Sequence, residues 1–156
     1  MVQTTSSALV EQFLLPDTPV AVAQLYGGLR EQANQQDFGL LVDDVVVLDT
    51  ETTGLSFKKC ELIEIAAARI EGGQISDTFQ TFVHPHAPIP EEITKLTHIS
   101  NVDVVDAPSA EDAVAALAEF VGGMPVLAHN ATFDRTFIEK VKGGKLVSDT
   151  LIDTLA

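Results

Sequence analysis

The sequence contains a single cysteine, no tryptophan and only nine basic residues among 156. The lone Cys60 cannot form an internal disulfide, which excludes a disulfide-stabilised scaffold and fits a reducing compartment. No apolar run approaches the length of about 18 residues that a membrane-spanning helix needs, so we expect no membrane segment. Residues 1–10 lack the basic flank and apolar stretch of a signal peptide. We therefore expect a cytoplasmic protein.

Acidic residues dominate the charge of the chain. Nine lysines and arginines stand against 23 aspartates and glutamates, which gives a formal net charge of −14. Proteins that bind nucleic acid through its phosphates carry a basic face, so this chain would on average repel nucleic acid. A role on nucleic acid would need a small local contact, a metal ion that reverses the local charge, or a tethered partner.

The length and a hydrophobic content of 46% predict one folded domain with a buried core. Residues 1–44 differ from the rest, because they contain two amphipathic stretches, no convincing strand and one basic residue, Arg30. We expect them to form a helical N-terminal extension that covers the domain or contacts a partner. Residues 45–156 are expected to form the main domain.

The pattern from residue 44 onward predicts an α/β fold. The β-branched run at residues 45–48 is typical of a central strand buried on both faces. Gly72-Gly73 separates two further strands and predicts a hairpin, with later elements expected as a short helix after Pro90, a helix from Pro108 to Gly122, a strand at 126–128 and a helix at 130–141. The order β, β, β, α, α, β, α indicates a mixed sheet, in which an antiparallel three-stranded meander is joined by a parallel strand and flanked by helices.

Two acidic residues follow the first strand directly. Asp49 and Glu51 are two positions apart, so they point to the same side of the strand. A D-x-E triplet alone is weak evidence, because it is expected by chance about once in two chains of this length. Its place at the mouth of an apolar strand, followed by Thr52-Thr53-Gly54-Leu55, makes it a candidate site.

A third acid lies on the apolar stripe of a predicted helix. Asp134 falls near 100° from Phe133, inside the arc of about 140° that reaches Phe137 and Ile138. A favourable interaction with the helix dipole is one account, worth about 0.3–1 kcal/mol. The other is that Asp134 points towards Asp49 and Glu51 and shares divalent cations with them. Such all-oxygen clusters suit Mg²⁺ or Mn²⁺, and two ions can hydrolyse phosphodiester bonds.

The chain resembles the DEDD superfamily of 3′-5′ exonucleases, in particular the branch of the proofreading epsilon subunit and RNase T. The resemblance rests on residues 47–55, VLDTETTGL, and on residues 128–134, AHNATFD. It implies a ribonuclease-H-like fold, a two-metal mechanism and hydrolysis from a 3′ end. Asp49, Glu51 and Asp134 match the catalytic metal ligands of the family. The resemblance also assigns substrate contacts to Thr52, Thr53, Gly54, Leu55, Asn130 and Phe133.

The third motif of the family, His-x4-Asp or Tyr-x3-Asp, does not follow the second one in this sequence. His98 and His129 each precede an aspartate at the right spacing, but too early in the chain, and we treat both pairs as coincidences. In the family, this motif supplies the general base and the fourth acid. Loss of a positioned base typically costs 10²- to 10⁴-fold in rate. We therefore expect the C-terminal part of the domain to be missing and these 156 residues alone to be inactive or nearly so.

Two hypotheses remain open. The first is a 3′-5′ exonuclease of proofreading or repair type that acts on a single-stranded 3′ end, DNA more than RNA, together with a polymerase or helicase subunit or fused domain. The second is an inactive exonuclease-like binding module. A His-x4-Asp within about 30–60 residues downstream in the reading frame would favour the first. The lysines at positions 58, 59, 140, 142 and 145 could guide a strand, although ordinary solvated surface is the simpler account.

Overall fold

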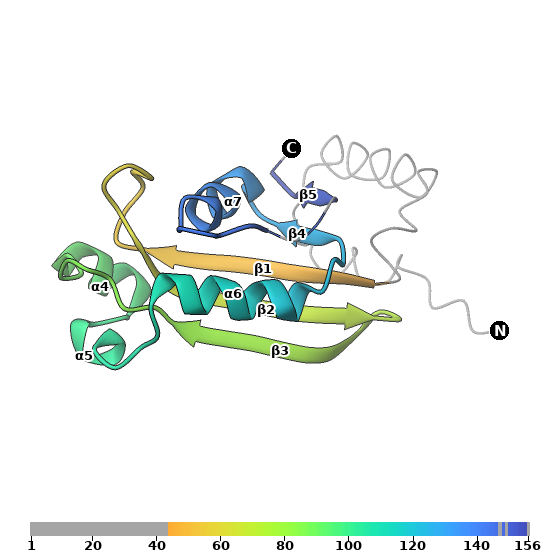
Figure 1. The fold of residues 1–156 in the computed structure, drawn as a ribbon, viewed down its shortest axis with the longest axis horizontal. Coiled ribbons are helices and arrows are strands. Elements are labelled where there is room, and N and C mark those ends of the chain that lie inside the picture. Colours follow the sequence, from red (N-terminus) through yellow and green to blue (C-terminus); the bar gives the residue numbers. More distant parts are fainter. Residues whose placement is uncertain (1–43, 147, 149, 156) are drawn as a thin grey trace, which may run out of the picture. The chain divides into compact units, whose positions relative to one another are not determined.

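The computed structural model describes residues 44–146, 148 and 150–155 (Figure 1). The expected helical extension at 1–44 therefore lies outside the described residues, apart from Asp44, which begins a strand. The described part contains a five-stranded sheet with helices, in the order β1 (Asp44–Thr52), β2 (Leu62–Glu71), β3 (Gln74–Phe82), α4 (Glu91–Thr97), α5 (Asn101–Val104), α6 (Ala110–Val121), β4 (Val126–Ala128), α7 (Ala131–Glu139) and β5 (Leu151–Asp153). No helix in this part is long and apolar enough to cross a membrane.

The strands lie in the order β3-β2-β1-β4-β5. β1 pairs antiparallel with β2, and β2 pairs antiparallel with β3, through the hairpin that Gly72-Gly73 predicts. β4 and β5 continue the sheet in parallel to β1. This arrangement confirms the predicted mixed sheet. It also places the C-terminal ends of β1, β4 and β5 at the same edge, where α7 begins (Figure 1).

One face of the sheet carries the main core. Val46 and Leu48 of β1 are buried against α6 and α7, whose contributions include Leu117 and Phe137. A second, smaller cluster joins β2 to the region of α4 and α5 through Ile63, Ile89, Ile99 and Val104. The largest side chains of α7 therefore anchor it directly beside β1, which brings the second sequence motif next to the first.

The expectation that β1 is buried on both faces is met only at its start, where the neighbouring Val45 and Val46 are both buried. From Val46 onward the side chains alternate: Val46, Leu48 and Thr50 are buried, whereas Val47 is 37% exposed and Asp49 is exposed. An uninterrupted apolar run from 45 to 48 does not distinguish the two cases, because a valine on an exposed strand face is common enough. The consequence is functional, since the less buried face of β1 is the one that carries Asp49 and Glu51.

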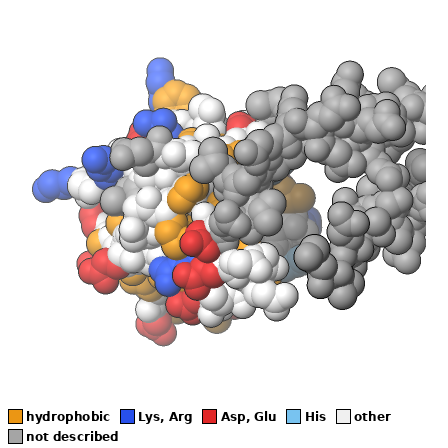
Figure 2. Space-filling view, turned by 90° about the vertical axis from the view of Figure 1, so that its right-hand side faces the viewer, with side chains coloured by type: hydrophobic (Ala, Val, Ile, Leu, Met, Phe, Trp, Pro, Cys, Tyr) orange, Lys and Arg blue, Asp and Glu red, His pale blue; other side chains and the backbone are white. Residues whose placement is uncertain are grey.

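Two elements were not predicted. The four-residue helix α5 begins at a capping box, in which Ser100 and Asp103 bond to each other's backbone, and Asp103 therefore has a local structural partner. The three-residue strand β5 pairs with β4. His98 occupies the left-handed position that ends α4, with φ of 62°. On the face shown in Figure 2, most of the basic side chains lie at the upper left, and most of the acidic ones lie below them.

Candidate functional site

The three candidate acids lie in the region where β1 ends and α7 begins, and their charges act on one another. Asp134, in the first turn of α7, is 3% exposed and accepts a hydrogen bond of 2.7 Å from the Thr50 hydroxyl of β1. Thr50 lies between Asp49 and Glu51, so this bond fastens the acid of the helix to the acidic end of the strand. The carboxylate of Asp134 faces Thr50 itself. Within the described residues, no three His, Cys, Asp or Glu side chains lie close enough together to hold a metal ion.

Negative charge nevertheless dominates the electrostatics of the site. Burial raises the pKa of Asp134, and the carboxylate of Asp49 raises it further, against the hydrogen bond from Thr50, which lowers it. Burial also raises the pKa of Glu51, followed by the charges of Asp49, Glu64 and Asp134. A cation placed among these oxygens would favour the ionised form of every one of them. The donor set is all carboxylate, which fits the hard cations Mg²⁺ and Mn²⁺.

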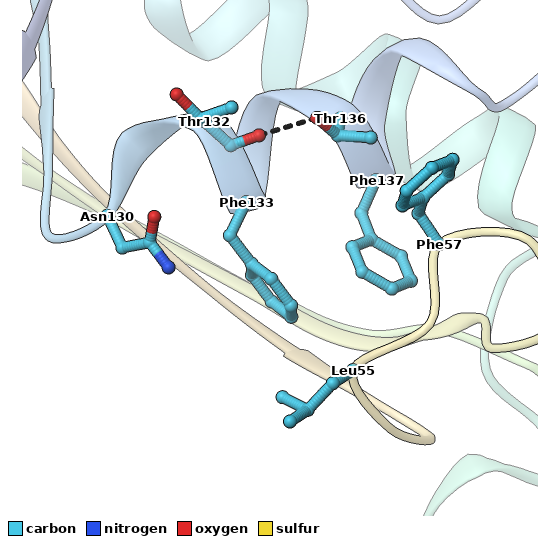
Figure 3. A pocket seen from close by; sticks show the side chains of 7 residues that line it. All are labelled: Leu55, Phe57, Asn130, Thr132, Phe133, Thr136 and Phe137. Carbon is cyan, nitrogen blue, oxygen red and sulfur yellow. Dashed lines mark hydrogen bonds between the residues drawn. The ribbon is translucent and has the colours of Figure 1, made fainter.

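An apolar pocket of about 250 Å³ lies between α7, the helix that carries Asp134, and the loop after β1 (Figure 3). α7 and the turn before it supply one wall, and the loop after β1 supplies the other through Leu55 and Phe57. The rings of Phe133 and Phe137 lie 4.8 Å apart between centroids, and Leu55 is 87% exposed. An exposed leucine opposite aromatic rings can take a flat, apolar group between them. The lining residues are Leu55, Phe57, Asn130, Thr132, Phe133, Thr136 and Phe137.

Three of the six residues predicted to contact substrate line this pocket: Leu55, Asn130 and Phe133. The other three shape the loop. Thr52 is buried and donates its hydroxyl to the carbonyl of Gly54 at 2.8 Å, and the Thr53 hydroxyl accepts from the backbone N–H of Glu61. Gly54 has φ of 150°, and a Cβ there would meet the Sγ of Cys60 at 3.0 Å. This position therefore requires glycine.

Sequence reasoning missed Phe57, Thr132, Thr136 and Phe137 as pocket residues. Phe137 was identified only as a core residue, which it also is. The one available signal was Phe57, an aromatic side chain two positions after Leu55 in the same loop, and it is 50% exposed. The two threonines could not be found, because their place in the pocket depends on where the loop after β1 crosses α7.

The start of α7 is built without a side-chain cap of its own. Asn130 has left-handed geometry, with φ of 59°, and makes no capping hydrogen bond through its side chain. Asp153, at the end of β5, accepts instead from the backbone N–H of Asn130 at 2.9 Å and of Leu155 at 2.9 Å. These bonds lower the pKa of Asp153. His129 bonds to Thr154 in the same region, at 2.9 Å. The segment 153–155 thus orients the turn that leads into Phe133 and Asp134.

Comparison with known proteins identifies similar sequences and structures. A family model described as Exonuclease matches residues 46–142. The PolC-type DNA polymerase III of Caldanaerobacter subterraneus subsp. tengcongensis is 47% identical over 117 residues, which are 74% of this chain and 8% of that protein. The corresponding polymerase of Clostridium perfringens is 42% identical over 115 residues, with 72% and 8% covered. The chain therefore spans about 8% of the length of these curated relatives.

Solved structures agree. Exonuclease X, in complex with 5′-overhanging duplex DNA, is 31% identical, with a TM-score of 0.51 over 60% of this chain and 52% of that one. Exonuclease I has a TM-score of 0.61 at 14% identity, over 72% of this chain and 28% of that one, and supports the fold alone. The ribonuclease-H-like fold predicted from the resemblance is confirmed.

Proposed function

The chain belongs to the exonuclease family, and from that premise we propose that it is the catalytic part of a metal-dependent 3′-5′ exonuclease that removes nucleotides from a DNA end. The observation that carries the proposal is the electrostatic coupling of Asp49, Glu51 and Asp134 at the end of β1, where the Thr50 hydroxyl holds Asp134. Acids that raise one another's pKa are costly unless a cation is part of the site.

In this proposal Asp49, Glu51 and Asp134 hold the divalent cations. When bound, two such ions supply an activated water and stabilise the leaving oxygen of a phosphodiester. Leu55 and Phe133 bind the terminal base between them, and Asn130 offers its amide to the same nucleotide. Apolar stacking of this kind accepts any base, as an enzyme that shortens a strand stepwise requires.

We further propose that the chain works beside a polymerase, as a proofreading domain. Two observations support this: its relatives of 42–47% identity are PolC-type DNA polymerases, and the chain covers about 8% of their length. A domain of net charge −14 gains little long-range attraction for DNA. A polymerase that already holds the strand would deliver the 3′ end to it and raise the effective concentration of that end.

The test uses the natural gene product and single-stranded DNA labelled at its 5′ end. In Mn²⁺ we expect a ladder of products shortened from the 3′ end. Asp49→Ala abolishes the ladder, and Asp106→Asn, which changes an exposed acid distant in sequence from both motifs, retains it. Immediate release of the labelled nucleotide would show the opposite polarity and contradict the proposal. Absence of both turnover and Mn²⁺ binding would favour an exonuclease-like interaction module.

A further inference from the structure

The loop at residues 53–61 forms one wall of the pocket and is held at its base. The backbone N–H of Thr53 donates to the carbonyl of Glu61 at 2.8 Å, and the N–H of Glu61 donates back to the Thr53 hydroxyl at 2.9 Å. Glu61 also fixes the neighbouring segment, because its carboxylate accepts from His86 Nδ1 at 2.7 Å and from the backbone N–H of His86 at 3.0 Å. None of these bonds reaches the outer part of the loop, where Phe57 lies.

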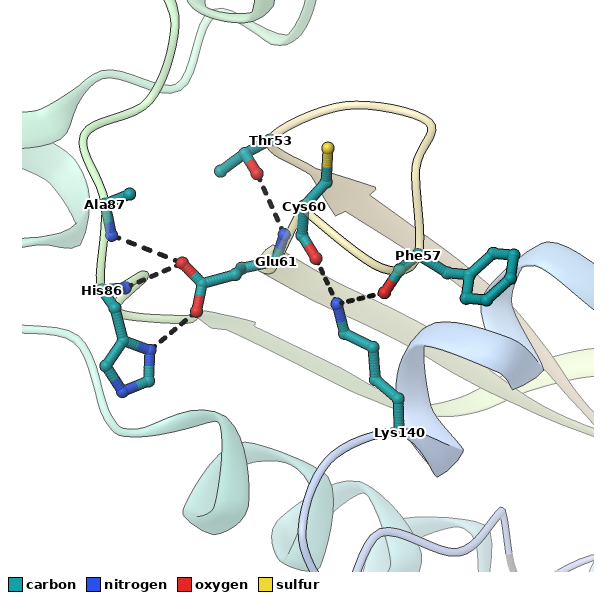
Figure 4. Close-up of polar contacts among 7 residues, drawn as sticks. All are labelled: Thr53, Phe57, Cys60, Glu61, His86, Ala87 and Lys140. Carbon is teal, nitrogen blue, oxygen red and sulfur yellow. Dashed lines mark hydrogen bonds and ion pairs between the residues drawn. The ribbon is translucent and has the colours of Figure 1, made fainter.

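Lys140, directly after α7, reaches that outer part (Figure 4). Its ammonium donates to the carbonyl of Phe57 at 3.0 Å and to the carbonyl of Cys60. It also lies 4.5 Å from the centre of the Phe137 ring, within the range of a cation–π interaction. An ammonium has three N–H donors, and two carbonyls and a ring face occupy its surroundings here.

The two carbonyls belong to a tight turn that needs such a partner. The N–H groups of Lys59 and Cys60 both donate to the carbonyl of Ser56, at 2.9 and 2.8 Å, so the chain makes one helix-like turn. The carbonyls at the C-terminal end of such a turn have no partner within it and carry partial negative charge. A cation is the preferred group at this place.

We infer that Lys140 is a positioning residue, which fastens the loop wall of the pocket to the helix wall and so sets the width of the pocket. One helix supplies both the wall, through Phe133, Thr136 and Phe137, and the residue that holds the opposite wall in place. The inference rests on the proposed function only for the nature of the ligand, a terminal nucleotide. Lys140 is one of the lysines that could guide a nucleic-acid strand, and the inference gives it a role other than contact with phosphate.

The anchoring is tested without any ligand, by limited trypsin digestion of the folded chain. Lys58 and Lys59 are exposed in the loop and provide the cleavage sites. In Lys140→Met we expect cleavage at these two sites to be at least about threefold faster than in the wild type, because local opening of the loop becomes easier. Lys140→Arg restores slow cleavage. The control is Lys142→Met, which changes an exposed lysine two positions further on. Equal cleavage rates in Lys140→Met and Lys142→Met overturn the inference.

The effect on the pocket is tested with a thymidine oligonucleotide that carries 2-aminopurine at its 3′ end and a phosphorothioate at its last linkage. Stacking in the pocket quenches the fluorescence. We expect Lys140→Met to bind this oligonucleotide about fivefold more weakly, because a hydrogen-bonded surface ammonium is lost. The dependence of the affinity on salt is expected to stay unchanged. A phosphate ligand would instead lower the slope of log affinity against log salt by about one. That result, or wild-type affinity, overturns the inference. Failure of the wild type to quench would count against the proposed function, while the trypsin digestion still decides on the anchoring.

Discussion

Asp134 is the only acidic side chain that is buried in the part of the chain that the structure describes. Burial raises its pKa, so the folded chain binds a proton there more tightly than the unfolded chain does. Its charged form therefore costs stability at every pH above the raised pKa, and the cost disappears as the pH falls through that value. We predict that Asp134→Asn raises the free energy of unfolding of the metal-free chain at pH 7.

Urea denaturation across pH checks this prediction. The advantage of Asp134→Asn shrinks on acidification, because the wild type regains stability when Asp134 takes up its proton. Asp106→Asn is the control, since it changes an exposed acid. A wild type that is more stable than Asp134→Asn at pH 7 without metal would show that the carboxylate is compensated by something other than a cation.

Thr50 supplies the one side-chain hydrogen bond to Asp134, at 2.7 Å, among the described residues. In Thr50→Val the buried carboxylate loses this donor, whereas the shape of the side chain is nearly kept. We predict a loss of about 1–2 kcal/mol in the free energy of unfolding at pH 7, as for a buried hydrogen bond to a charged group. Thr78→Val, on the exposed strand β3, serves as the control and changes stability by less than about 0.5 kcal/mol. Equal effects of the two changes would contradict the role of Thr50.

Residue-scale prediction from the sequence succeeded where a local period carries the information. The position of Asp134 on the buried stripe of α7 followed from helix geometry, and the structure has it buried. Its partner could not be predicted, because Thr50 and Asp134 are 84 positions apart and only the packing of α7 on β1 joins them. Whether the three acids share cations is not decided by the fold and stays a prediction.

At the scale of elements, α7 depends on β5 for its start. Asp153 accepts from the backbone N–H of Asn130, the left-handed residue before α7, whose own side chain makes no capping hydrogen bond. We predict that Asp153→Ala lowers the melting temperature and speeds amide hydrogen exchange in the first turn of α7, where Phe133 and Asp134 lie. Because the pKa of Asp153 is lowered by these bonds, the same loss occurs in the wild type as the pH falls through that lowered pKa.

Exchange measured by mass spectrometry on peptides from α6 and α7 separates a local from a global effect. In Asp153→Ala, protection falls in α7 and stays unchanged in α6 (Ala110–Val121), which Ser109 caps independently. Unchanged protection at the start of α7 would mean that the turn at His129-Asn130 is held by other contacts.

The elements that could be predicted are those with strong local signals. The hairpin of β2 and β3 follows from Gly72-Gly73, and α6 lies between Ser109 and Gly122, which have the expected cap geometries. The strand β5 has three residues and no turn signal of its own, and it exists because β4 offers a free edge. Such short elements are products of the assembled sheet and leave little trace in the sequence.

At the scale of the whole molecule, the acidic charge limits how strongly the proposed exonuclease can attract DNA. A formal charge of −14 leaves few lysines and arginines to displace counterions from phosphates. We predict that affinity for a single-stranded 3′ end in the presence of Mg²⁺ depends only weakly on KCl, with a slope of log affinity against log salt shallower than about −2. Fluorescence anisotropy between about 50 and 200 mM KCl measures it. A slope near −5 would require a basic surface and contradict this account.

Because negative charge is in excess, the proposed catalytic site depends on bound cations. The most direct test is electron paramagnetic resonance of Mn²⁺ titrated with the chain, because the signal of the free ion reports how many ions are bound. We predict that the wild type binds up to two Mn²⁺ ions, that Asp49→Asn and Asp134→Asn each lose this binding, and that Asp106→Asn keeps it. If Asp134→Asn bound as much Mn²⁺ as the wild type, the ions would lie elsewhere and the proposed catalytic site would be wrong.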